Sequence, residues 1–467
     1  MSDLLLNIPE LINLGICRAT WQGPVPPSMN AIAGVSTDSR HIKAGELFVA
    51  IVGDKFDGHG FIGQAIEKKA IASVVNEKWY AKHKDKFKSG SFIVVDDTLV
   101  AYQEFARYYR NKFNIPVIAI TGSAGKTTCK DLVTNVLLQK YNVLKNIKSF
   151  NNHIGVPATL FDLRPEHEIL VAELGTNHIG ELERLSYLVT PSACLITNIG
   201  YAHLEFFKDL NGVAKAKMEI FSSIQEEGIA FYNADDKILR LTKFPVANHF
   251  SYGIDNPADV HGTIVDCDDN GCYTFKVKNK KIKLQLPGRH NVSNALAAAA
   301  VGEKYSLSAD EIREALEGTT AGEKRMQVVT VCDIKFVNDS YNSNPGSCYA
   351  ALNTLKDMRV RGRGRRIAVL GDMLELGGYA KPEHEKLAEV ASQFNINALF
   401  LYGNETRATL KAAQKLSFDK AEHFETKSDL QLGLLAYLRE NDIVLVKGSR
   451  SMQMETVVEN TSSLLNR

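Results

Sequence analysis

Short apolar runs alternate with longer amphipathic stretches through the middle of the chain. Between residues 113 and 325, five such runs predict strands: 115–120, 141–144, 169–174, 193–197 and 228–232. Helical patterns, with apolar residues three or four positions apart, lie between most of them. This alternation is typical of a parallel sheet with crossover helices. In such sheets ligands bind beyond the carboxyl ends of the strands.

The same pattern of strands and helices precedes and follows this segment. Before it lie strand-like runs at 47–52 and 71–75, with a helical stretch at 63–69. A hairpin (272–278 with 281–286) and an Ala-rich helix (288–302) end the middle segment, and a second hairpin (327–332 with 334–338) and strand-like runs at 366–370, 398–402 and 443–446 follow. We therefore predict an α/β protein of three domains, 1–112, 113–325 and 326–467, the middle one built on a parallel sheet.

Composition narrows the function classes. The chain of 467 residues is 45% hydrophobic and 23% charged, which is typical of a soluble globular protein. Its formal net charge of +1 argues against a nucleic-acid partner or a membrane surface. No apolar run approaches the roughly 18 residues of a membrane span, and residues 1–15 lack the basic start of a signal peptide. Seven cysteines without a C-x-x-C pair indicate reduced thiols, so we expect a cytoplasmic location.

A Gly-containing turn follows the first strand of the middle segment, and a helical pattern begins directly after it. Its residues are Thr121, Gly122, Ser123, Ala124, Gly125, Lys126, Thr127 and Thr128. Backbone N–H groups in such a loop can surround a phosphate, with Lys126 on the β/γ-phosphates and the Thr127 hydroxyl on Mg²⁺. The full Walker pattern has a Gly where this chain has Ile120, so the loop is a shortened variant. A plain strand–turn–helix is the alternative.

Polar residues lie at the ends of other predicted strands. Glu173 ends one strand, Asn198 follows another, and His203 comes five residues later. These side chains could converge on one crevice with the phosphate loop. Glu173 there is a natural Mg²⁺ ligand, although it could also cap the following helix. His203 is either a ligand or a structural histidine.

Lys217 lies within an apolar helical stripe. Val213, Lys217 and Phe221 recur every four residues, whereas Lys215 faces away from that stripe. A buried ammonium is costly unless it is paired, deprotonated or modified. Alternatively, the stem of Lys217 packs while its charged end reaches water.

Three further sets of polar residues have two interpretations, one structural and one functional. Residues 36–40, which are Ser, Thr, Asp, Ser and Arg, form a cluster that is common in solvated turns. Asn291 and Asn294 begin a helix, where capping is the expected role and ligand binding the alternative. The basic run 361–366 could meet phosphate, but a solvated loop is favoured because no aromatic residues interleave with it.

Over nearly its whole length, the chain resembles the Mur ligases of peptidoglycan synthesis. The motifs that carry the resemblance are TDSRHIKAGELFVA (37–50), FDGHGF (56–61), TGSAGKTT (121–128), NNHIGVP (151–157), ELGTNHIGE (173–181), AHLEFF (202–207), AKAKMEIF (214–221), GRHNVSNALAA (288–298), KRMQ (324–327), NDSYNSNP (338–345), GDMLELG (371–377) and KGSRSMQME (447–455). The loop motif is common to the family and to folylpolyglutamate synthetases. The motifs at 173–181, 338–345 and 447–455 together resemble the members that add D-alanyl-D-alanine.

The resemblance implies a uridine-nucleotide-binding domain, an ATP-binding P-loop domain and a C-terminal Rossmann-like domain. It also implies ATP and Mg²⁺ as cofactors, with UDP-N-acetylmuramoyl-tripeptide and D-alanyl-D-alanine as substrates. ATP would phosphorylate the tripeptide carboxylate, and the amine of D-alanyl-D-alanine would attack the acyl phosphate. The third residue of the tripeptide is either meso-diaminopimelate or L-lysine, and we expect a monomer.

The resemblance also assigns roles to residues. Besides the phosphate loop it implies Asn294, Arg325 and Asp339 for ATP; Thr127, Glu173, His203 and a carbamylated Lys217 for metal; Ser36, Asp38, Ser39, Arg40, Asn151 and Asn152 for the UDP-substrate; and Asn342 and Asn344 for the acceptor. Catalysis would fall to Lys126, Glu173, His203, Lys217 and Arg325. Alternative functions are a sister ligase, a folylpolyglutamate synthetase, or a P-loop ATPase that regulates a partner.

Overall fold

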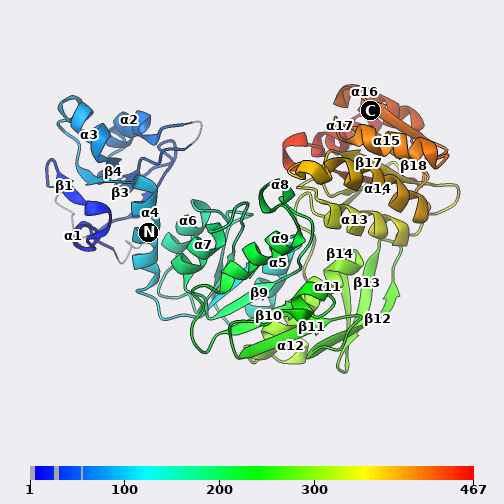
Figure 1. Cartoon of the computed structure of the whole chain (residues 1–467), viewed down its shortest axis with the longest axis horizontal. Coiled ribbons are helices and arrows are strands. Elements are labelled where there is room, and N and C mark those ends of the chain that lie inside the picture. The colour runs from blue at the N-terminus through cyan, green and yellow to red at the C-terminus, as the bar shows by residue number, and fades with distance from the viewer. Residues whose placement is uncertain (1–5, 26–30, 54–55, 467) are drawn as a thin grey trace.

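The structure is a computed structural model that describes residues 6–25, 31–53 and 56–466. Three sheets follow one another along the chain, each with its own helices (Figure 1). This arrangement confirms the predicted three-domain α/β class. The first five residues of the segment examined for a signal peptide lie outside the described ranges.

The N-terminal sheet has five strands in the order β1-β5-β4-β3-β2. Its strands are β1 (Thr20–Gln22), β2 (Gly34–Ser36), β3 (Glu46–Val49), β4 (Ala72–Asn76) and β5 (Phe92–Val95). The α-helices of this part are α1 (Ile8–Asn13), α2 (Ile62–Glu67), α3 (Glu77–His83) and α4 (Thr98–Arg110). Helix α4 leads into the middle domain, where the Tyr109 hydroxyl donates to the Leu163 carbonyl at 2.8 Å.

The middle sheet has nine strands in the order β14-β13-β12-β11-β10-β9-β6-β8-β7. They are β6 (Val117–Thr121), β7 (Val143–Lys145), β8 (Ile169–Glu173), β9 (Ala193–Ile196), β10 (Ile229–Asn233), β11 (Asn248–Gly253), β12 (Val260–Cys267), β13 (Cys272–Val277) and β14 (Lys280–Pro287). Pairing is parallel from β7 to β12, and β13 and β14 continue the sheet antiparallel. The sequence predicted the strands on both sides of β6 but not β11 or β12, because half of the residues of β11 and most of those of β12 are exposed or half-buried.

The middle helices pack against both faces of this sheet. They are α5 (Lys126–Leu137), α6 (Gly155–Phe161), α7 (Glu181–Val189), α8 (Leu204–Phe207), α9 (Leu210–Met218), α10 (Lys237–Leu241), α11 (Arg289–Lys304) and α12 (Ala309–Glu317). Helix α11 lies directly on α5, since a Cβ added at Gly302 would come within 2.7 Å of Val136. The close approach explains the Ala-rich face predicted for α11, and it holds the start of that helix beside the start of α5.

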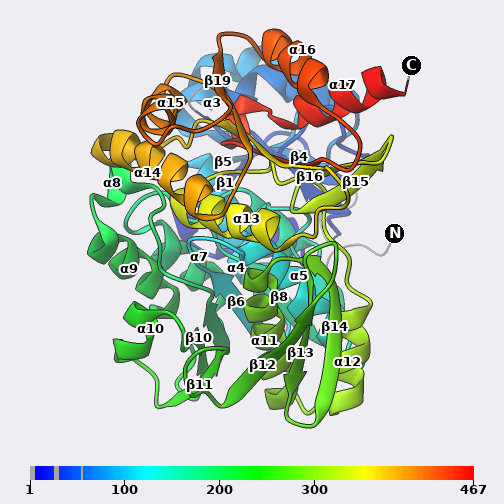
Figure 2. The ribbon, with the colours of Figure 1, turned by 90° about the vertical axis from the view of Figure 1, so that its right-hand side faces the viewer.

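The C-terminal sheet has six strands in the order β15-β16-β20-β17-β18-β19, parallel except for the edge strand β15 (Figure 2). They are β15 (Gln327–Val331), β16 (Ile334–Asn338), β17 (Arg366–Gly371), β18 (Ala398–Tyr402), β19 (Ala421–Phe424) and β20 (Ile443–Lys447). Helices α13 (Pro345–Asp357), α14 (Ala380–Gln393), α15 (Thr406–Lys415), α16 (Lys427–Tyr437) and α17 (Glu455–Leu465) accompany them. Strand β19 was not predicted, since only one of its four residues is fully buried.

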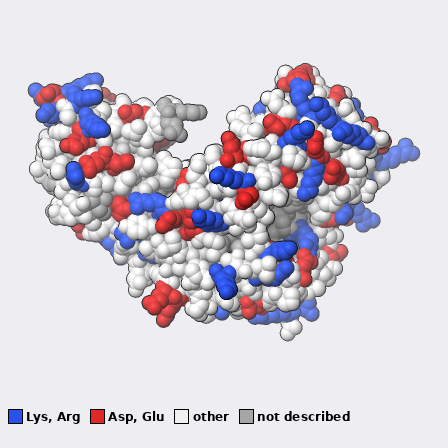
Figure 3. Space-filling model, in the orientation of Figure 1, with Lys and Arg blue, Asp and Glu red and all other residues white. Residues whose placement is uncertain are grey.

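The N-terminal and C-terminal domains lie at opposite ends of the middle domain, and the molecule is hollowed between them (Figures 1 and 3). The C-terminal domain docks through polar contacts. Arg361, in the basic run predicted to be a solvated loop, pairs with Asp269 of the middle domain at 3.0 Å. Arg365 of the same run pairs with the fully buried Asp442 at 2.7 Å. The run enters β17 through a loop over 361–365, as predicted, with residues 361–363 exposed, and both arginines pair with protein carboxylates.

Within the described ranges, no helix is both long enough and apolar enough to cross a membrane.

Candidate active site

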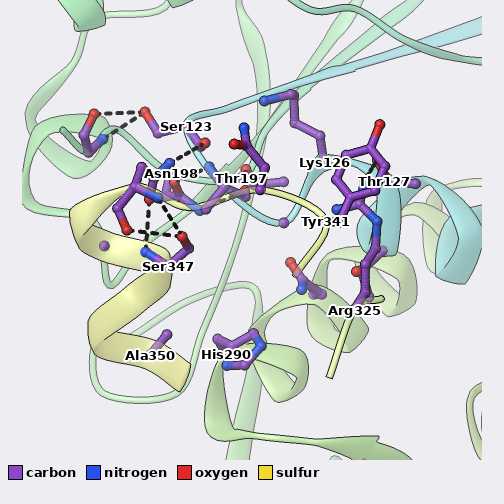
Figure 4. A pocket seen from close by; sticks show the side chains of 18 of the residues that line it. Ser123, Lys126, Thr127, Thr197, Asn198, His290, Arg325, Tyr341, Ser347 and Ala350 are labelled. Carbon is purple, nitrogen blue, oxygen red and sulfur yellow. Dashed lines mark hydrogen bonds between the residues drawn. The ribbon is translucent and has the colours of Figure 1, made fainter. Parts of the chain in front are cut away.

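A cavity of about 1310 Å³ lies between the middle and C-terminal domains. Its walls come from the phosphate loop, the ends of β8 and β9, the start of α11, the linker around Arg325, and the segment 339–350 (Figure 4). Most of these elements meet at the carboxyl edge of the middle sheet, where parallel α/β sheets bind ligands.

The phosphate loop is held in shape by backbone and amide contacts. Asn198 accepts a hydrogen bond from the Ala124 N–H at 3.0 Å, and its backbone carbonyl accepts one from Ser123 at 3.0 Å. Gly122 has φ +148°, and a Cβ there would lie 1.9 Å from the Thr197 hydroxyl. Only glycine fits that position, since any side chain would collide with Thr197, the residue just after β9.

Helix α5 begins after Gly125 in a left-handed conformation, and no side chain caps it. The first N–H groups of an α-helix lack intrahelical partners, so this end is suited to an anion. Lys126 folds back onto the loop and donates to the Gly122 carbonyl at 2.7 Å. Burial lowers the pKa of Lys126, Glu173 raises it and Arg325 lowers it further.

Arg325 reaches this loop from the linker. Its guanidinium donates to the Thr127 hydroxyl at 3.0 Å and lies 3.9 Å from the centre of the Tyr341 ring. The loop therefore has two cationic side chains beside it, Lys126 and Arg325, as expected where a phosphoryl group is transferred.

Glu173 is 1% exposed at the end of β8 and lines the cavity. Asn151 donates to its Oε1 at 2.7 Å, whereas no described residue donates a hydrogen bond to its Oε2. The ammonium of Lys130 lies 3.6 Å from that Oε2. A buried carboxylate oxygen with spare capacity is a suitable ligand for a hard cation such as Mg²⁺. Glu173 does not cap the following helix, because Gly180 is the N-cap of α7.

Lys130 was not singled out from the sequence. It is 1% exposed and donates to the carbonyls of Asn146, at 3.0 Å, and Lys148. The sequence does contain a signal for Lys130: it lies one helical turn after Lys126, among the buried positions of α5, and so faces the same side of the helix. Because Asn146 also accepts from the Glu173 N–H at 2.6 Å, Lys130 holds the segment that positions Glu173.

His203 lines the same cavity, but its Nδ1 contacts Glu375 of the C-terminal domain at 2.5 Å. Among the described residues, no group of three or more His, Cys, Asp or Glu side chains is placed to hold a metal ion. Glu173 and His203 would therefore need Thr127, a modified lysine, substrate oxygens or water to complete a coordination shell.

Asn291 and Asn294 do not cap α11, because Gly288 is its N-cap and no side-chain cap forms. The capping prediction is wrong for both. Asn294 donates to Asn291 at 3.0 Å, and a Cβ added at Gly125 would lie 2.8 Å from the Asn294 amide oxygen. Both line the cavity, and Asn294 lies against the phosphate loop.

The segment after β16 brings the C-terminal domain to this loop. Asp339 pairs with the buried Lys447 at 2.6 Å. Asn344 caps α13 by accepting from the Ser347 N–H, and it donates to the Ser123 carbonyl at 3.1 Å. Asn342 is an exposed residue of the cavity wall. Asp339, Asn342 and Asn344 thus share one cavity with the loop.

The predicted UDP-substrate residues fall into two groups. Asn151 and Asn152 line the cavity, and Asn152 also accepts from the Gly155 N–H at 2.9 Å at the start of α6. Ser36, Asp38, Ser39 and Arg40 are not among its lining residues; they lie in the N-terminal domain, where Arg40 pairs with Asp38 at 2.8 Å. Hydrogen bonds from the Arg40 side chain and backbone and from His41 lower the pKa of Asp38.

Lys217 is 1% exposed, and its neighbours on the stripe, Val213 and Phe221, are buried too. Lys215 is exposed, as predicted. Lys217 is not among the residues that line the cavity. Burial and the Lys126 ammonium lower its pKa well below the usual value, against the opposing effect of Glu181 and Glu219. The interpretation in which the charged end of Lys217 reaches water is wrong, and burial shifts its amine toward the neutral form.

Comparison with known families agrees with this geometry. The model described as Mur ligase family, catalytic domain matches residues 31–118, Mur ligase middle domain matches 120–302, and Mur ligase, glutamate ligase domain matches 324–450. The chain belongs to the Mur ligase family.

Two similar relatives carry the name UDP-N-acetylmuramoyl-tripeptide–D-alanyl-D-alanine ligase. The Bacillus subtilis protein is 32% identical, with 97% of each chain covered, and the Escherichia coli protein is 36% identical, with 91% of this chain and 92% of the relative covered. Among solved structures, MurF from Acinetobacter baumannii superimposes with a TM-score of 0.87 at 28% identity, over 99% of this chain and 100% of that one. The MurF ligase from Thermotoga maritima in complex with ADP gives 0.81 at 25% identity, over 93% and 98%.

Proposed function

We propose that this chain is the ATP-dependent ligase that joins D-alanyl-D-alanine to UDP-N-acetylmuramoyl-tripeptide and releases ADP and phosphate. One observation carries the proposal: the uncapped start of α5, two cationic side chains and a buried carboxylate share a cavity with the C-terminal domain. The relatives' shared name and the ADP complex of a similar structure support the substrates and ATP.

The chemistry requires activation of a carboxylate. A tripeptide carboxylate oxygen attacks the γ-phosphorus, and ADP leaves. The amine of D-alanyl-D-alanine then attacks the carbonyl carbon of the acyl phosphate, loses a proton, and displaces phosphate to form the amide. The enzyme's contribution is positioning and neutralisation of charge. Lys126, Arg325 and the N–H groups at the start of α5 would face the transferring phosphoryl group.

Mg²⁺ belongs to this proposal because the donors fit it. Thr127, Glu173 and His203 would hold the metal, which would supply charge neutralisation on the phosphates. Lys217 does not line the cavity as an amine, and it would join them only through the added carbamate. The Glu173 oxygen without a hydrogen bond is the structural reason. The Lys126 and Arg325 cations would still be needed at the phosphates beside the metal.

The remaining assignments stay proposals of the same kind. Asn294 and Asp339 would serve ATP, with Asn342 and Asn344 near the acceptor and Asn151 and Asn152 near the tripeptide. Ser36, Asp38, Ser39 and Arg40 would bind the uridine nucleotide from the N-terminal domain. The three domain boundaries, a cytoplasmic location and a monomeric state also remain predictions.

The test is phosphate release measured with each substrate omitted in turn, using tripeptides that end in meso-diaminopimelate or L-lysine. We expect release only when ATP, one of the two tripeptides and D-alanyl-D-alanine are all present, with the preferred tripeptide identifying the third residue. Release with ATP alone would instead indicate a regulatory ATPase. Release that requires a free amino acid in place of D-alanyl-D-alanine would indicate a sister ligase.

A further inference from the structure

Tyr341 connects the C-terminal domain to two separate parts of the middle domain. It lies just after β16, in the loop between Asp339 and α13. Its ring faces the Arg325 guanidinium at 3.9 Å, and its hydroxyl contacts the hydroxyl of Ser149. Its backbone N–H donates to the Lys324 carbonyl at 3.1 Å. Figure 4 shows the ring beside Thr127 and Arg325, at the wall of the cavity.

The ring contact fixes a catalytic cation. Arg325 has a long side chain with several rotatable bonds, and its guanidinium donates to the Thr127 hydroxyl at 3.0 Å. An aromatic face attracts a guanidinium and restricts its plane. Without the ring, the guanidinium would keep the hydrogen bond to Thr127 but lose the aromatic face that restricts its plane.

The Tyr341 hydroxyl contacts the segment that positions the Glu173 carboxylate. Ser149 belongs to the segment 146–151, and the first and last residues of this segment both bind Glu173. Asn146 accepts from the Glu173 N–H at 2.6 Å, and Asn151 donates to the Glu173 Oε1 at 2.7 Å. Contact at Ser149 therefore restrains the segment that sets the position of the carboxylate.

We propose that Tyr341 is a positioning residue that couples docking of the C-terminal domain to assembly of the phosphate site. Its ring orients Arg325, and its hydroxyl secures the segment 146–151 around Glu173. It performs no chemistry itself. The catalytic consequence rests on the proposed ligase function, whereas the restraint on the two segments is a property of the folded chain alone.

Hydrogen exchange of the full-length protein tests the restraint without any substrate. Tyr341→Phe and Ser149→Ala should speed exchange in peptides that cover 146–151 and leave those covering 322–328 unchanged. Tyr341→Leu should speed exchange in both. Tyr379→Leu is the matched control, because it removes a ring that stacks on Tyr201 at another point of the same domain interface, 5.9 Å between centroids. Unchanged exchange at 322–328 in Tyr341→Leu, or an equal rise in Tyr379→Leu, would overturn the proposal.

Kinetics test the coupling to Arg325. We expect Tyr341→Leu to lower kcat about 10- to 100-fold, the scale of a small misplacement of a catalytic group, while the Kd for ATP measured by calorimetry changes little. Tyr341→Phe should recover most of that loss. In an Arg325→Lys background, Tyr341→Leu should cause little further loss, since the ring then has no guanidinium to orient. If the kcat losses of Arg325→Lys and Tyr341→Leu multiply in the double variant, the assigned role is contradicted. If the wild-type protein forms no amide, the ligase function is refuted, but the hydrogen-exchange result still tests the restraint by Tyr341.

Discussion

Lys126 and Arg325 place two positive charges at the uncapped start of α5. Removing either charge should therefore lower the rate of phosphoryl transfer. Lys126 is held by the Gly122 carbonyl at 2.7 Å, so the ammonium already lies within the loop. A preorganised cation of this kind stabilises the transition state without reorganisation at the moment of reaction.

We predict that Lys126→Ala loses about 100- to 1000-fold in kcat, the usual cost of removing one preorganised electrostatic partner. Steady-state phosphate release measures the loss, and circular dichroism checks that the fold survives. Lys140→Ala is the control, because Lys140 is an exposed lysine just after α5. Turnover of Lys126→Ala near that of wild type would exclude the assignment.

Lys217 provides a second prediction at this scale. Burial and the nearby Lys126 ammonium lower its pKa, so the neutral amine that attacks CO₂ persists to lower pH than in a free lysine. We expect a carbamate, seen as a planar three-atom extension in electron density and as a ¹³C resonance after growth with labelled bicarbonate. Activity should fall as pH falls and the ammonium forms.

Its matched control is Lys215→Ala, which should keep near-normal activity because Lys215 is exposed on the same helix. Lys217→Ala should be severely impaired. An unmodified Lys217 ammonium in a crystal of active enzyme with Mg²⁺ bound would refute the modification.

The sequence identified individual site residues better than it identified their partners. Lys126, Glu173 and Arg325 were found because short motifs name them, and the structure brings all three to one cavity. Lys130 and Tyr341 were missed because their importance comes from contacts between segments far apart in the chain. The capping reading of Asn291 and Asn294 was wrong because Gly288 already begins that helix.

At the scale of elements, the turn between β6 and α5 depends on a glycine that no other residue can replace. Gly122→Ala would force a methyl group to within 1.9 Å of the Thr197 hydroxyl, at a φ of +148°. We predict a loss of about 2 kcal/mol or more in the free energy of unfolding, since a strained backbone residue alone costs about 1–3 kcal/mol.

Urea denaturation followed by circular dichroism measures this loss. Gly60→Ala is the control, because a Cβ at Gly60 has nothing within 4 Å and that residue has an ordinary φ. Equal stability of the two variants would mean that the loop adapts to a side chain.

Strands with long buried runs, such as β6 and β8, were predicted from their apolar character alone. Strands β11, β12 and β19 were missed because exposed or half-buried residues make up half or more of each strand and interrupt the local apolar pattern. Each of these strands is defined by its pairing with a neighbouring strand. That pairing depends on the strand order of the whole sheet, which a local sequence pattern does not show.

At the scale of the whole molecule, the middle and C-terminal domains form most of the cavity, and Leu99 of α4 adds one lining residue from the N-terminal domain, whose sheet lies across the hollow (Figures 1 and 3). One reaction needs the phosphate loop, the segment 338–345 and a substrate that reaches the N-terminal domain. We therefore predict that the full ligand set draws the domains together, as in other ligand-clamping enzymes.

Small-angle X-ray scattering should show a smaller radius of gyration with an ATP analogue, the UDP-tripeptide and D-alanyl-D-alanine than for the free chain. Each ligand added alone serves as the control. Superimposable profiles with and without the full set would count against closure.

The central claim is that the tripeptide carboxylate is activated by phosphorylation. A tripeptide whose terminal carboxylate carries ¹⁸O in both oxygens tests it directly, because the attacking oxygen must leave with phosphate. Mass spectrometry of the products should find one ¹⁸O in each released phosphate and one in each new amide. Unlabelled phosphate, released together with the amide, would contradict the acyl-phosphate mechanism.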